Sequence, residues 1–569
     1  MIIGRFAMVL HTHLPYVINH GVWPHGLDWL NECAAESYIP VLNTLNILKN
    51  EGFHPHLTIE ITPVLTEQLK DPVFVDAFLN YLQMKIDAAI HDREVFTEWN
   101  RPHLIELTYM WEDFYKNTRT NFIEHYNKDI AGAFKDLQDQ GLIEIMTCAA
   151  THGYLPLLKT DASIQAQIAM GVRVYRQHYG RDPLGIWLPE CGYRPGYRWK
   201  PPVGKDQKSY LRKGLEEILG ENGIKYFIVD THLLLGGEAV GVYQARFKAL
   251  RVLWETFKAQ YKPEPVQKEK SPYEAYLIGS NPAIDPVAVF TRDPKTSVQL
   301  WSAEHGYPGD GWYLEFHKKN FPGGLRYWRV TSRKLSLGDK LEYEPDKVIA
   351  RLDENAGHYK GLIKQVLQEY FKKTGQPGLI VAPYDTELFG HWFFEGSEFL
   401  YRVLKWVEMD PELELTTCGA YLQSFPPSTV IKLPEGSWGE GQGHWIWLNE
   451  WTVWTWEKVY ECEDIMIDLA NKYSNTSDQN LQNILTQTAR ELLLLESSDW
   501  QFLISTWNAR DYAENRAAEH YNRFKRLADM AKAYANQQNI DEGDWTYLRQ
   551  LESEDHLFKD IDLSLWRSK

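Results

Sequence analysis

The sequence has few cysteines and no long hydrophobic run. Its five cysteines are scattered, with no CxxC pair, which indicates a reducing compartment rather than a disulfide framework. No stretch approaches the roughly 18 apolar residues of a transmembrane helix. The opening MIIGRFAMVLHTH lacks the long apolar stretch and small-residue exit of a cleavable signal. We therefore expect a cytoplasmic protein.

Positive charge is also in deficit. The chain has 60 Lys and Arg against 77 Asp and Glu, a formal net charge of −17. Nucleic acids and anionic membranes bind clustered Lys and Arg, so this balance argues against both as partners. A neutral ligand would be indifferent to the charge.

Aromatic residues, by contrast, are abundant. The chain has 22 Trp and 32 Tyr among 569 residues. A buried indole needs a partner for its N–H group, so core packing alone rarely uses so many Trp. Flat apolar faces with a polar edge suit the C–H faces and hydroxyl rims of sugars. A large helical core rich in aromatics is the alternative explanation.

Seven short apolar runs alternate with helix-like stretches, the pattern of parallel strands with crossover helices. We expect these strands at 5–13, 56–63, 143–151, 185–190, 224–232, 298–304 and 378–385. Most of them end in a polar residue, as on the catalytic face of a barrel. An open doubly wound sheet would also place ligands at strand ends, so the pattern alone leaves closure undecided.

Two other regions differ in composition. The stretch after Glu190 is rich in Pro, Gly and Lys around one good strand and is typical of an insertion with long loops. The chain becomes helical from about Thr416, with amphipathic runs at 458–473 and 482–496.

Two histidines, His11 and His13, lie two residues apart at a predicted strand end and so face one side. From spacing alone they can be metal ligands, partners of sugar hydroxyls or core groups. A metal site would need a further ligand, which His152 could supply. This keeps a zinc-dependent deacetylase or mannosidase as a rival interpretation.

Carboxylates also follow predicted strands. Glu190 ends WLPE, and Asp385 ends GLIVAPYD beside the aromatic cluster HWFF, which shields an acid from water as a proton donor requires. Cleaving a glycosidic bond takes two such carboxyl groups, one on each side of the bond. A solvated loop glutamate is the alternative for Glu190. On these grounds alone Glu60, Asp230 and Glu304 are equally eligible.

Several longer motifs resemble those of a known family, and this resemblance is separate from the arguments on residue spacing. They are HTHLPYV (11–17), HGYLPLL (152–158), WLPECGYRPG (187–196), SAEHGYPGD (302–310) and APYDTELFGHWFFEG (382–396). Together, and in this order, they resemble the motifs of glycoside hydrolase family 57. SWGEGQGHWIWLNE (437–450) and LLLLESSDWQFLISTWNARDYA (492–513) resemble the helical C-terminal domain of that family's branching enzymes.

The resemblance implies an α/β fold: a (β/α)7 barrel with an inserted small domain and a helical C-terminal domain. Residues 1–190 and 284–415 would form the barrel, 191–283 the inserted domain and 416–569 the helical domain. It also implies that the chain cuts α-1,4-glucans (amylose, glycogen or starch-like) with retention and makes α-1,6 branches. The reaction would pass through a covalent glucosyl-enzyme, with no metal or organic cofactor.

The motifs further imply roles for particular residues. Glu190 matches the nucleophile and Asp385 the acid/base. The positions that match substrate-binding residues are His11, His13, Trp29, His152, Arg292, Trp301, Gly309, Trp438, Trp447, Asp499 and Asn508. Tyr243 is the candidate for the tyrosine of the loop that covers the site.

The chain departs from the family pattern at two places. Where the branching enzymes have T-G-Q-A after SSDW, this chain has Thr506-Trp507-Asn508-Ala509, with a shorter amide and added bulk. The segment 254–281 is also longer than usual, within the expected lid at 236–281. Both departures concern the acceptor chain. They leave α-amylase or 4-α-glucanotransferase activity as alternatives, with a zinc-dependent carbohydrate enzyme or an inactive glycan-binding protein outside the class.

Overall fold

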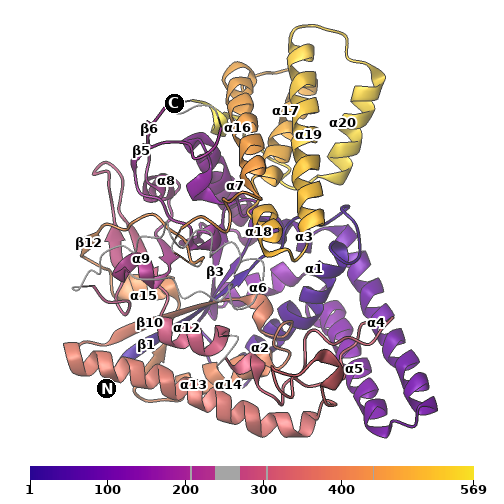
Figure 1. Ribbon diagram of the computed structural model, residues 1–569. Helices are drawn as coiled ribbons and strands as arrows, with labels where there is room; N and C mark the ends of the chain where they lie inside the picture. Colours follow the sequence, from indigo (N-terminus) through magenta and orange to yellow (C-terminus); the bar gives the residue numbers. More distant parts are fainter. Residues whose placement is uncertain (205–207, 237–269, 303–305, 440, 442, 569) are drawn as a thin grey trace.

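A computed structural model describes residues 1–204, 208–236, 270–302, 306–439, 441 and 443–568 (Figure 1). The predicted Tyr243, Glu304 and most of the expected lid lie outside these ranges. The five cysteines lie within them, and all are buried and free. No helix in the described ranges has the length and apolar character needed to cross a membrane.

Seven parallel strands form the centre of the fold, paired in the order β10-β1-β2-β3-β4-β7-β9. They are β1 (Gly4–Thr12), β2 (Leu57–Ile61), β3 (Ile143–Cys148), β4 (Gly185–Trp187), β7 (Tyr226–Val229), β9 (Val287–Thr291) and β10 (Gly378–Asp385). A parallel bridge from Arg292 to Val381 joins the two ends of the row. There the Asp293 N–H donates to the Val381 carbonyl at 2.9 Å. The expected seven-stranded α/β barrel is confirmed.

Burial explains why these segments are strands. All five residues of β2 and all five of β9 are buried, as both faces of a parallel sheet are covered. Shorter strands extend the sheet: β8 (Tyr276–Ile278) runs antiparallel to β9, β12 (Val430–Ile431) pairs with β8, and β11 (Leu413–Leu415) pairs with β1. A separate hairpin joins β5 (Tyr197–Trp199) to β6 (Tyr210–Arg212).

Helices surround the barrel. They are α1 (Leu27–Cys33), α2 (Ile39–Asn50), α3 (Pro63–Leu69), α4 (Pro72–Glu98), α5 (Pro102–Thr120), α6 (Ile130–Asp139), α7 (Asp161–Tyr179), α8 (Leu215–Glu221), α9 (Thr231–Leu235), α12 (Pro294–Trp301), α13 (Pro345–Thr374), α14 (Gly396–Glu408) and α15 (Cys418–Ser424). In Figure 1, α4 and α5 project as a long pair, and α13 and α14 lie along the side opposite the C-terminal helices.

The expected strand at 298–304 is wrong. Helix α12 (Pro294–Trp301) occupies its first half, and residues 303–305 lie outside the described ranges. The Asp293 side chain accepts a hydrogen bond from the Thr296 N–H at 2.7 Å, and Pro294 follows as the first helical residue. This Asp-Pro start is a strong helix signal that outweighs the apolar run after it. The strand of this region is β9, which the sequence reasoning had not identified.

The range 191–283, expected as an inserted domain, includes a barrel strand. Strand β7 pairs with β4 and β9, so this part of the range runs inside the main sheet. Strand β8 also belongs to that sheet, whereas the β5–β6 hairpin, α8 and α9 are described elements of the range that lie outside it.

The C-terminal region is helical, as expected. Its helices are α16 (Val453–Tyr473), α17 (Gln479–Leu495), α18 (Asp499–Thr506), α19 (Arg510–Ala535) and α20 (Glu542–Glu554). Figure 1 shows them stacked on one end of the barrel, with the short α18 nearest to it. The Ser498 N–H donates to the His152 carbonyl at 3.1 Å, which anchors the start of α18 to the loop after β3.

Candidate active site

The carboxyl ends of the barrel strands open into a cleft of about 890 Å³. Strand register brings its polar groups together, because His11 on β1 lies opposite Asp385 on β10 and Glu60 on β2. Nine of the predicted site residues line the cleft: His11, His13, Trp29, His152, Glu190, Asp385, Trp438, Asp499 and Asn508. They come from both the barrel and the C-terminal region.

Glu190 follows β4 in a short turn and has a left-handed backbone, with φ 60° and ψ 26°. A left-handed backbone costs free energy for a residue other than glycine, and such strain persists only where the surrounding contacts fix it. Trp438 supplies much of that fixation. Its backbone N–H donates to the Glu190 carbonyl at 3.0 Å, and its indole N–H donates to the Glu190 carboxylate at 2.6 Å.

The electrostatic surroundings of Glu190 favour the protonated form. Burial raises the pKa of Glu190 to about 8, and the negative charges of Asp385 and Asp499 add to the rise. The hydrogen bond from Trp438 works in the opposite direction. The site therefore retains a proton at neutral pH, and Trp438 is the group that favours the ionised Glu190.

Three histidine rings form a stack beside these carboxylates. The ring centroids of His13 and His152 are 4.0 Å apart, those of His11 and His152 are 5.1 Å apart, and Trp187 lies against His11 at 4.9 Å. Burial lowers the pKa values of His11 and His152 well below the usual range, and the neighbouring histidines lower them further. These two rings are therefore neutral and present one donor and one acceptor each.

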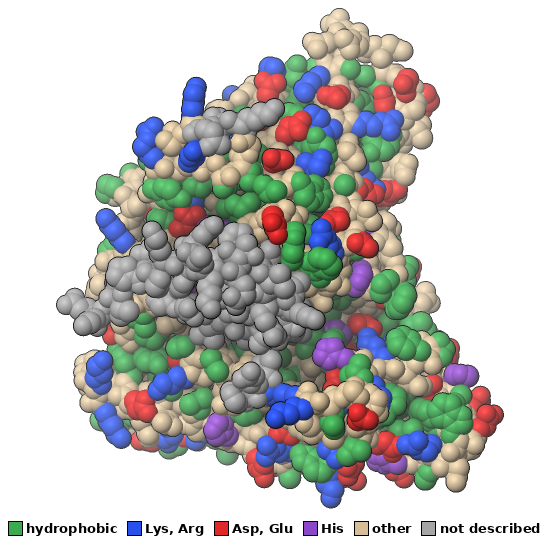
Figure 2. Space-filling view, viewed as in Figure 1, with side chains coloured by type: hydrophobic (Ala, Val, Ile, Leu, Met, Phe, Trp, Pro, Cys, Tyr) green, Lys and Arg blue, Asp and Glu red, His purple; other side chains and the backbone are tan. Residues whose placement is uncertain are grey.

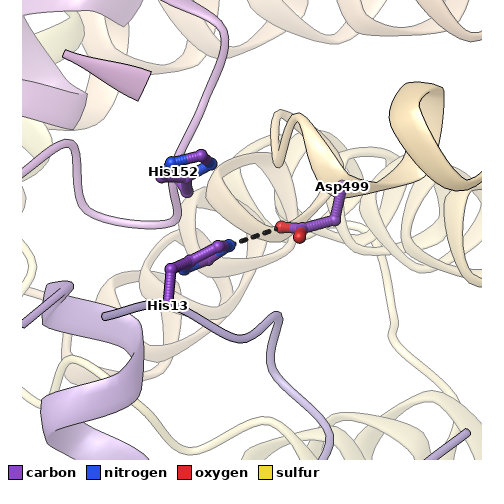
Figure 3. Close-up of side chains that lie close together, drawn as sticks. All are labelled: His13, His152 and Asp499. Carbon is purple, nitrogen blue, oxygen red and sulfur yellow. Dashed lines mark hydrogen bonds and ion pairs between the residues drawn. The ribbon is translucent and has the colours of Figure 1, made fainter. Parts of the chain in front are cut away.

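Hydrogen bonds fix the orientation of the rings. His11 Nδ1 contacts the Glu60 carboxylate at 2.5 Å, and His152 Nδ1 contacts the Ser498 hydroxyl at 2.8 Å. His13 Nε2 contacts Asp499 at 2.9 Å (Figure 3). The remaining ring nitrogen of His152, Nε2, is buried and has no hydrogen-bond partner among the described residues. It is thus available to a ligand that offers hydroxyl groups.

His13, His152 and Asp499 are also close enough together to be considered as metal ligands. Figure 3 shows the two imidazoles lying one above the other, with Asp499 beside them. Their planes differ by only 17°, with centroids 4.0 Å apart. An ion bound by imidazole lies near the ring plane, about 2.0–2.1 Å from the nitrogen. Two nearly parallel planes cannot both contain one ion at that distance, so this arrangement favours hydrogen bonding over metal binding.

The other predicted residues that the structure describes lie away from the cleft surface. Arg292 is buried behind Trp438, and Trp447 is fully buried with its ring 4.3 Å from that of Tyr154. Trp301 packs 6.2 Å from Trp392, which does line the cleft. Gly309 lies in a separate hollow of about 540 Å³, with the Arg333 guanidinium packed against it.

The departure at 506–509 has a structural explanation. Trp507 ends α18 with φ 60°, a left-handed position that glycine adopts more readily. Its side chain is 57% exposed and packs against Trp451 and Arg510 instead of entering the cleft. Asn508, the next residue, does line the cleft.

The sequence reasoning missed several cleft residues. Glu387 lies two residues after Asp385, and burial, opposed by a hydrogen bond from Tyr38, raises its pKa to about 8. Trp23 and Phe321 line the cleft with their side chains 73% and 68% exposed. The APYDTE motif contained Glu387, but nothing in the sequence linked Phe321 to Trp23.

Comparisons with known proteins agree with this geometry. Residues 7–434 match the family described as Glycosyl hydrolase family 57, and residues 458–566 match the 1,4-alpha-glucan branching enzyme C-terminal family. A 1,4-alpha-glucan branching enzyme of Thermococcus kodakarensis is 42% identical over 98% of this chain and 78% of its own.

Two solved structures are also similar over the whole chain. The branching enzyme of Pyrococcus horikoshii has a TM-score of 0.88 at 39% identity, covering 100% of this chain and 97% of its own. An alpha-amylase of Thermotoga maritima has a TM-score of 0.81 at 29% identity, covering 100% and 99%.

Proposed function

The chain belongs to glycosyl hydrolase family 57, and from that premise we propose that it is a 1,4-α-glucan branching enzyme that works by retaining transfer. The match of its C-terminal region to the branching-enzyme family supports branching in particular. The observation that carries the proposal is the contact of Asp499, on α18, with His13, which directly follows β1. Through it the C-terminal region forms one wall of the cleft that holds Glu190 and Asp385.

The proposed reaction has two steps. Glu190 attacks the anomeric carbon of an α-1,4 bond while Asp385 protonates the departing 4-oxygen, which leaves a glucan chain esterified to Glu190. The 6-hydroxyl of an acceptor chain then attacks that carbon, Asp385 takes the hydroxyl proton, and Glu190 leaves as a carboxylate. In the first step the Glu190–Asp385 pair must carry one proton, and Asp385 must hold it. By favouring the ionised Glu190, the Trp438 hydrogen bond supports that distribution.

The substrate class fits the surface as well as the cleft. Figure 2 shows basic and acidic side chains interspersed over the described part of this face, which suits a neutral polymer. Neutral imidazoles and exposed aromatic rings line the cleft and offer hydrogen bonds and flat faces to sugar. An α-glucan is therefore the proposed partner.

Hydrolysis is the second candidate, because an alpha-amylase is among the similar structures. A paired assay on amylose separates the two activities. Reducing ends before debranching report hydrolysis, and the increase after debranching reports α-1,6 branches. We expect mainly branches; mainly reducing ends before debranching would identify the chain as an amylase.

Asn508 provides a test of acceptor positioning. Water competes with the 6-hydroxyl at roughly 55 M, and a well-oriented acceptor reaches far higher effective molarity. Asn508→Ala should lower branch formation by about 2- to 10-fold, the value of one hydrogen bond, with hydrolysis nearly unchanged. Asn508→Gln is the matched control and should keep most branching. An equal loss of both activities in the paired assay would mean that Asn508 serves binding generally.

Trp438 does not report on the acceptor chain alone. Its contact with Glu190 means that Trp438→Ala should lower cleavage and branching together, rather than branching alone.

Metal removal tests the role of the histidines. Because the stacked rings suit hydrogen bonding, activity should survive exhaustive treatment with EDTA or phenanthroline. The measurement is the paired assay before and after treatment, with metal analysis of the purified protein. Stoichiometric zinc, with activity lost on removal and restored on return, would contradict this expectation.

A further inference from the structure

Four side chains form a row that leads from the cleft into the barrel wall. Glu190 accepts the indole N–H of Trp438, the guanidinium of Arg292 lies 5.6 Å from the centre of the Trp438 rings, and Arg292 is paired with Asp230. Asp230 follows β7, which pairs with β4, and Arg292 follows β9, which pairs with β7. The row thus connects three neighbouring strand ends to the proposed nucleophile.

Arg292 is placed to act on Trp438 rather than on a sugar. Its residue surface is 2% exposed, and it is not among the residues that line the cleft. Trp438, which does line the cleft, stands between Arg292 and Glu190. The substrate-binding role expected for Arg292 from the sequence would need it to move out of this position.

The Asp230–Arg292 pair is costly for a purely structural element. Taking two charges out of water carries a penalty that their attraction need not repay, so a buried pair is weak evidence for stability. Burial alone would raise the pKa of Asp230, yet Arg292, first through its charge, and His232 together outweigh burial and lower that pKa to about 2. Asp230 is also fixed by the Thr231 N–H, which donates to it at 2.6 Å. It therefore stays ionised and holds Arg292 in place.

A cation over an indole ring draws electron density from it and makes the N–H a stronger donor, and hydrogen bonds in such chains reinforce one another. Building on the proposed function, we propose that Arg292, held by Asp230, is a positioning residue for Glu190. It polarises Trp438 from behind and strengthens the hydrogen bond that keeps the Glu190 carboxylate oriented and ionised.

Other charged groups face the same row. Asp385 and Asp499 act on Glu190 and oppose its ionisation. Cys191 lies within the field of both Arg292 and Asp230, His232 Nδ1 is 3.6 Å from Asp230, and Tyr384 lies within the field of Arg292. None of these replaces the indole N–H as a donor to the Glu190 carboxylate.

The test is the double variant Asp230→Asn/Arg292→Gln, which removes both buried charges and keeps similar shapes. A weaker Trp438 hydrogen bond leaves the ionised Glu190 less favoured, so the acidic limb of the kcat profile should move to higher pH by about 0.5–1 unit. At pH 6, kcat on amylose should fall about 3- to 10-fold with KM nearly unchanged. Total bond cleavage, measured as reducing ends after debranching, is the readout.

The Trp438→Phe background shows whether the effect passes through the indole. Phe cannot donate to Glu190, so adding the double variant to Trp438→Phe should cause no further shift of the limb. A shift of equal size in both backgrounds would overturn the inference. If the Asp230→Asn/Arg292→Gln variant raised KM and left the acidic limb of the kcat profile in place, the inference would also be overturned. Arg292 would then have the substrate-binding role.

A second Asp–Arg pair, in which the Arg is buried and the Asp partly exposed, provides the control. Arg212 bonds Asp161 at 2.6 Å and lies 5.0 Å from the centre of the Trp199 rings, away from the cleft. Asp161→Asn/Arg212→Gln should leave the pH profile unchanged, and the same shift there would overturn the inference. If the Asp230→Asn/Arg292→Gln variant does not fold, Arg292→Lys is the deciding variant. The compact Lys ammonium, paired with Asp230, no longer places its positive charge over the Trp438 ring, so the acidic limb should again move to higher pH. A limb that stays in place would then count against the proposal.

Failure of this inference can be told from failure of the proposed function. If Glu190→Gln abolishes activity but the pair variant behaves as wild type, only the role of Arg292 is wrong. If Glu190→Gln stays active, the nucleophile itself is misassigned.

Discussion

Replacing Glu190 by Gln should reduce transfer on amylose to less than about 1% of wild type while the protein stays folded. The covalent step requires an ionised carboxylate, and the amide has nearly the same shape but cannot attack. The amide can still accept the Trp438 indole N–H, so the left-handed turn at Glu190 should persist. The measurement is total bond cleavage by the purified variant, with thermal unfolding to confirm the fold.

Glu144 offers a matched control for this substitution. It is another shielded glutamate on a barrel strand, and it accepts hydrogen bonds from the Tyr226 hydroxyl at 2.7 Å and the Gly419 N–H at 2.7 Å. It lies near the start of β3, away from the cleft. Glu144→Gln should keep the activity of wild type. If Glu190→Gln retained more than a few per cent of transfer, Glu190 would not be the nucleophile.

Replacing Asp385 by Asn should have an effect that depends on the substrate. On amylose the rate should fall by about 10²- to 10⁴-fold, because the leaving 4-oxygen loses its proton donor. In α-maltosyl fluoride the leaving group is fluoride ion, which needs little protonation. The variant should therefore form the glycosyl-enzyme from this substrate at a rate close to wild type. Fluoride release in the first turnover is the measurement.

The two variants provide controls for each other. Glu190→Gln should be inactive on both substrates, because an activated leaving group does not replace a missing nucleophile. If Asp385→Asn gains nothing from the fluoride, the acid/base role belongs elsewhere, and Glu387 is the nearest candidate in the chain.

The sequence predicted the barrel and most of the cleft because strand tips are local features. His11, Glu190 and Asp385 each end or follow an apolar run, and parallel strands bring such ends together. The same reasoning failed at 298–304, where an Asp-Pro helix start overrode an apolar run. The strand at 224–232, which is β7, was expected among the parallel strands, although the range 191–283 given to the inserted domain encloses it.

Contacts between distant residues were beyond prediction from composition and spacing. Trp438 reaches Glu190 across 248 residues, and Asp499 reaches His13 across 486. The motifs identified Glu190 as the nucleophile and the other three as substrate-binding positions, but not as partners of each other. Arg292 and Trp447 carry the same motif-based expectation, and only their burial shows that other side chains separate them from the cleft.

The central claim is a covalent glucan–Glu190 intermediate, and trapping it is the most direct test. In the Asp385→Asn variant the fluoride should load the enzyme quickly, while release to an acceptor, which needs a base, should be slow. Intact-protein mass spectrometry after quenching should show a mass gain of one maltosyl group, and peptide mapping should place it on the peptide that contains Glu190. Loading with no adduct, or an adduct on a different peptide, would contradict the account.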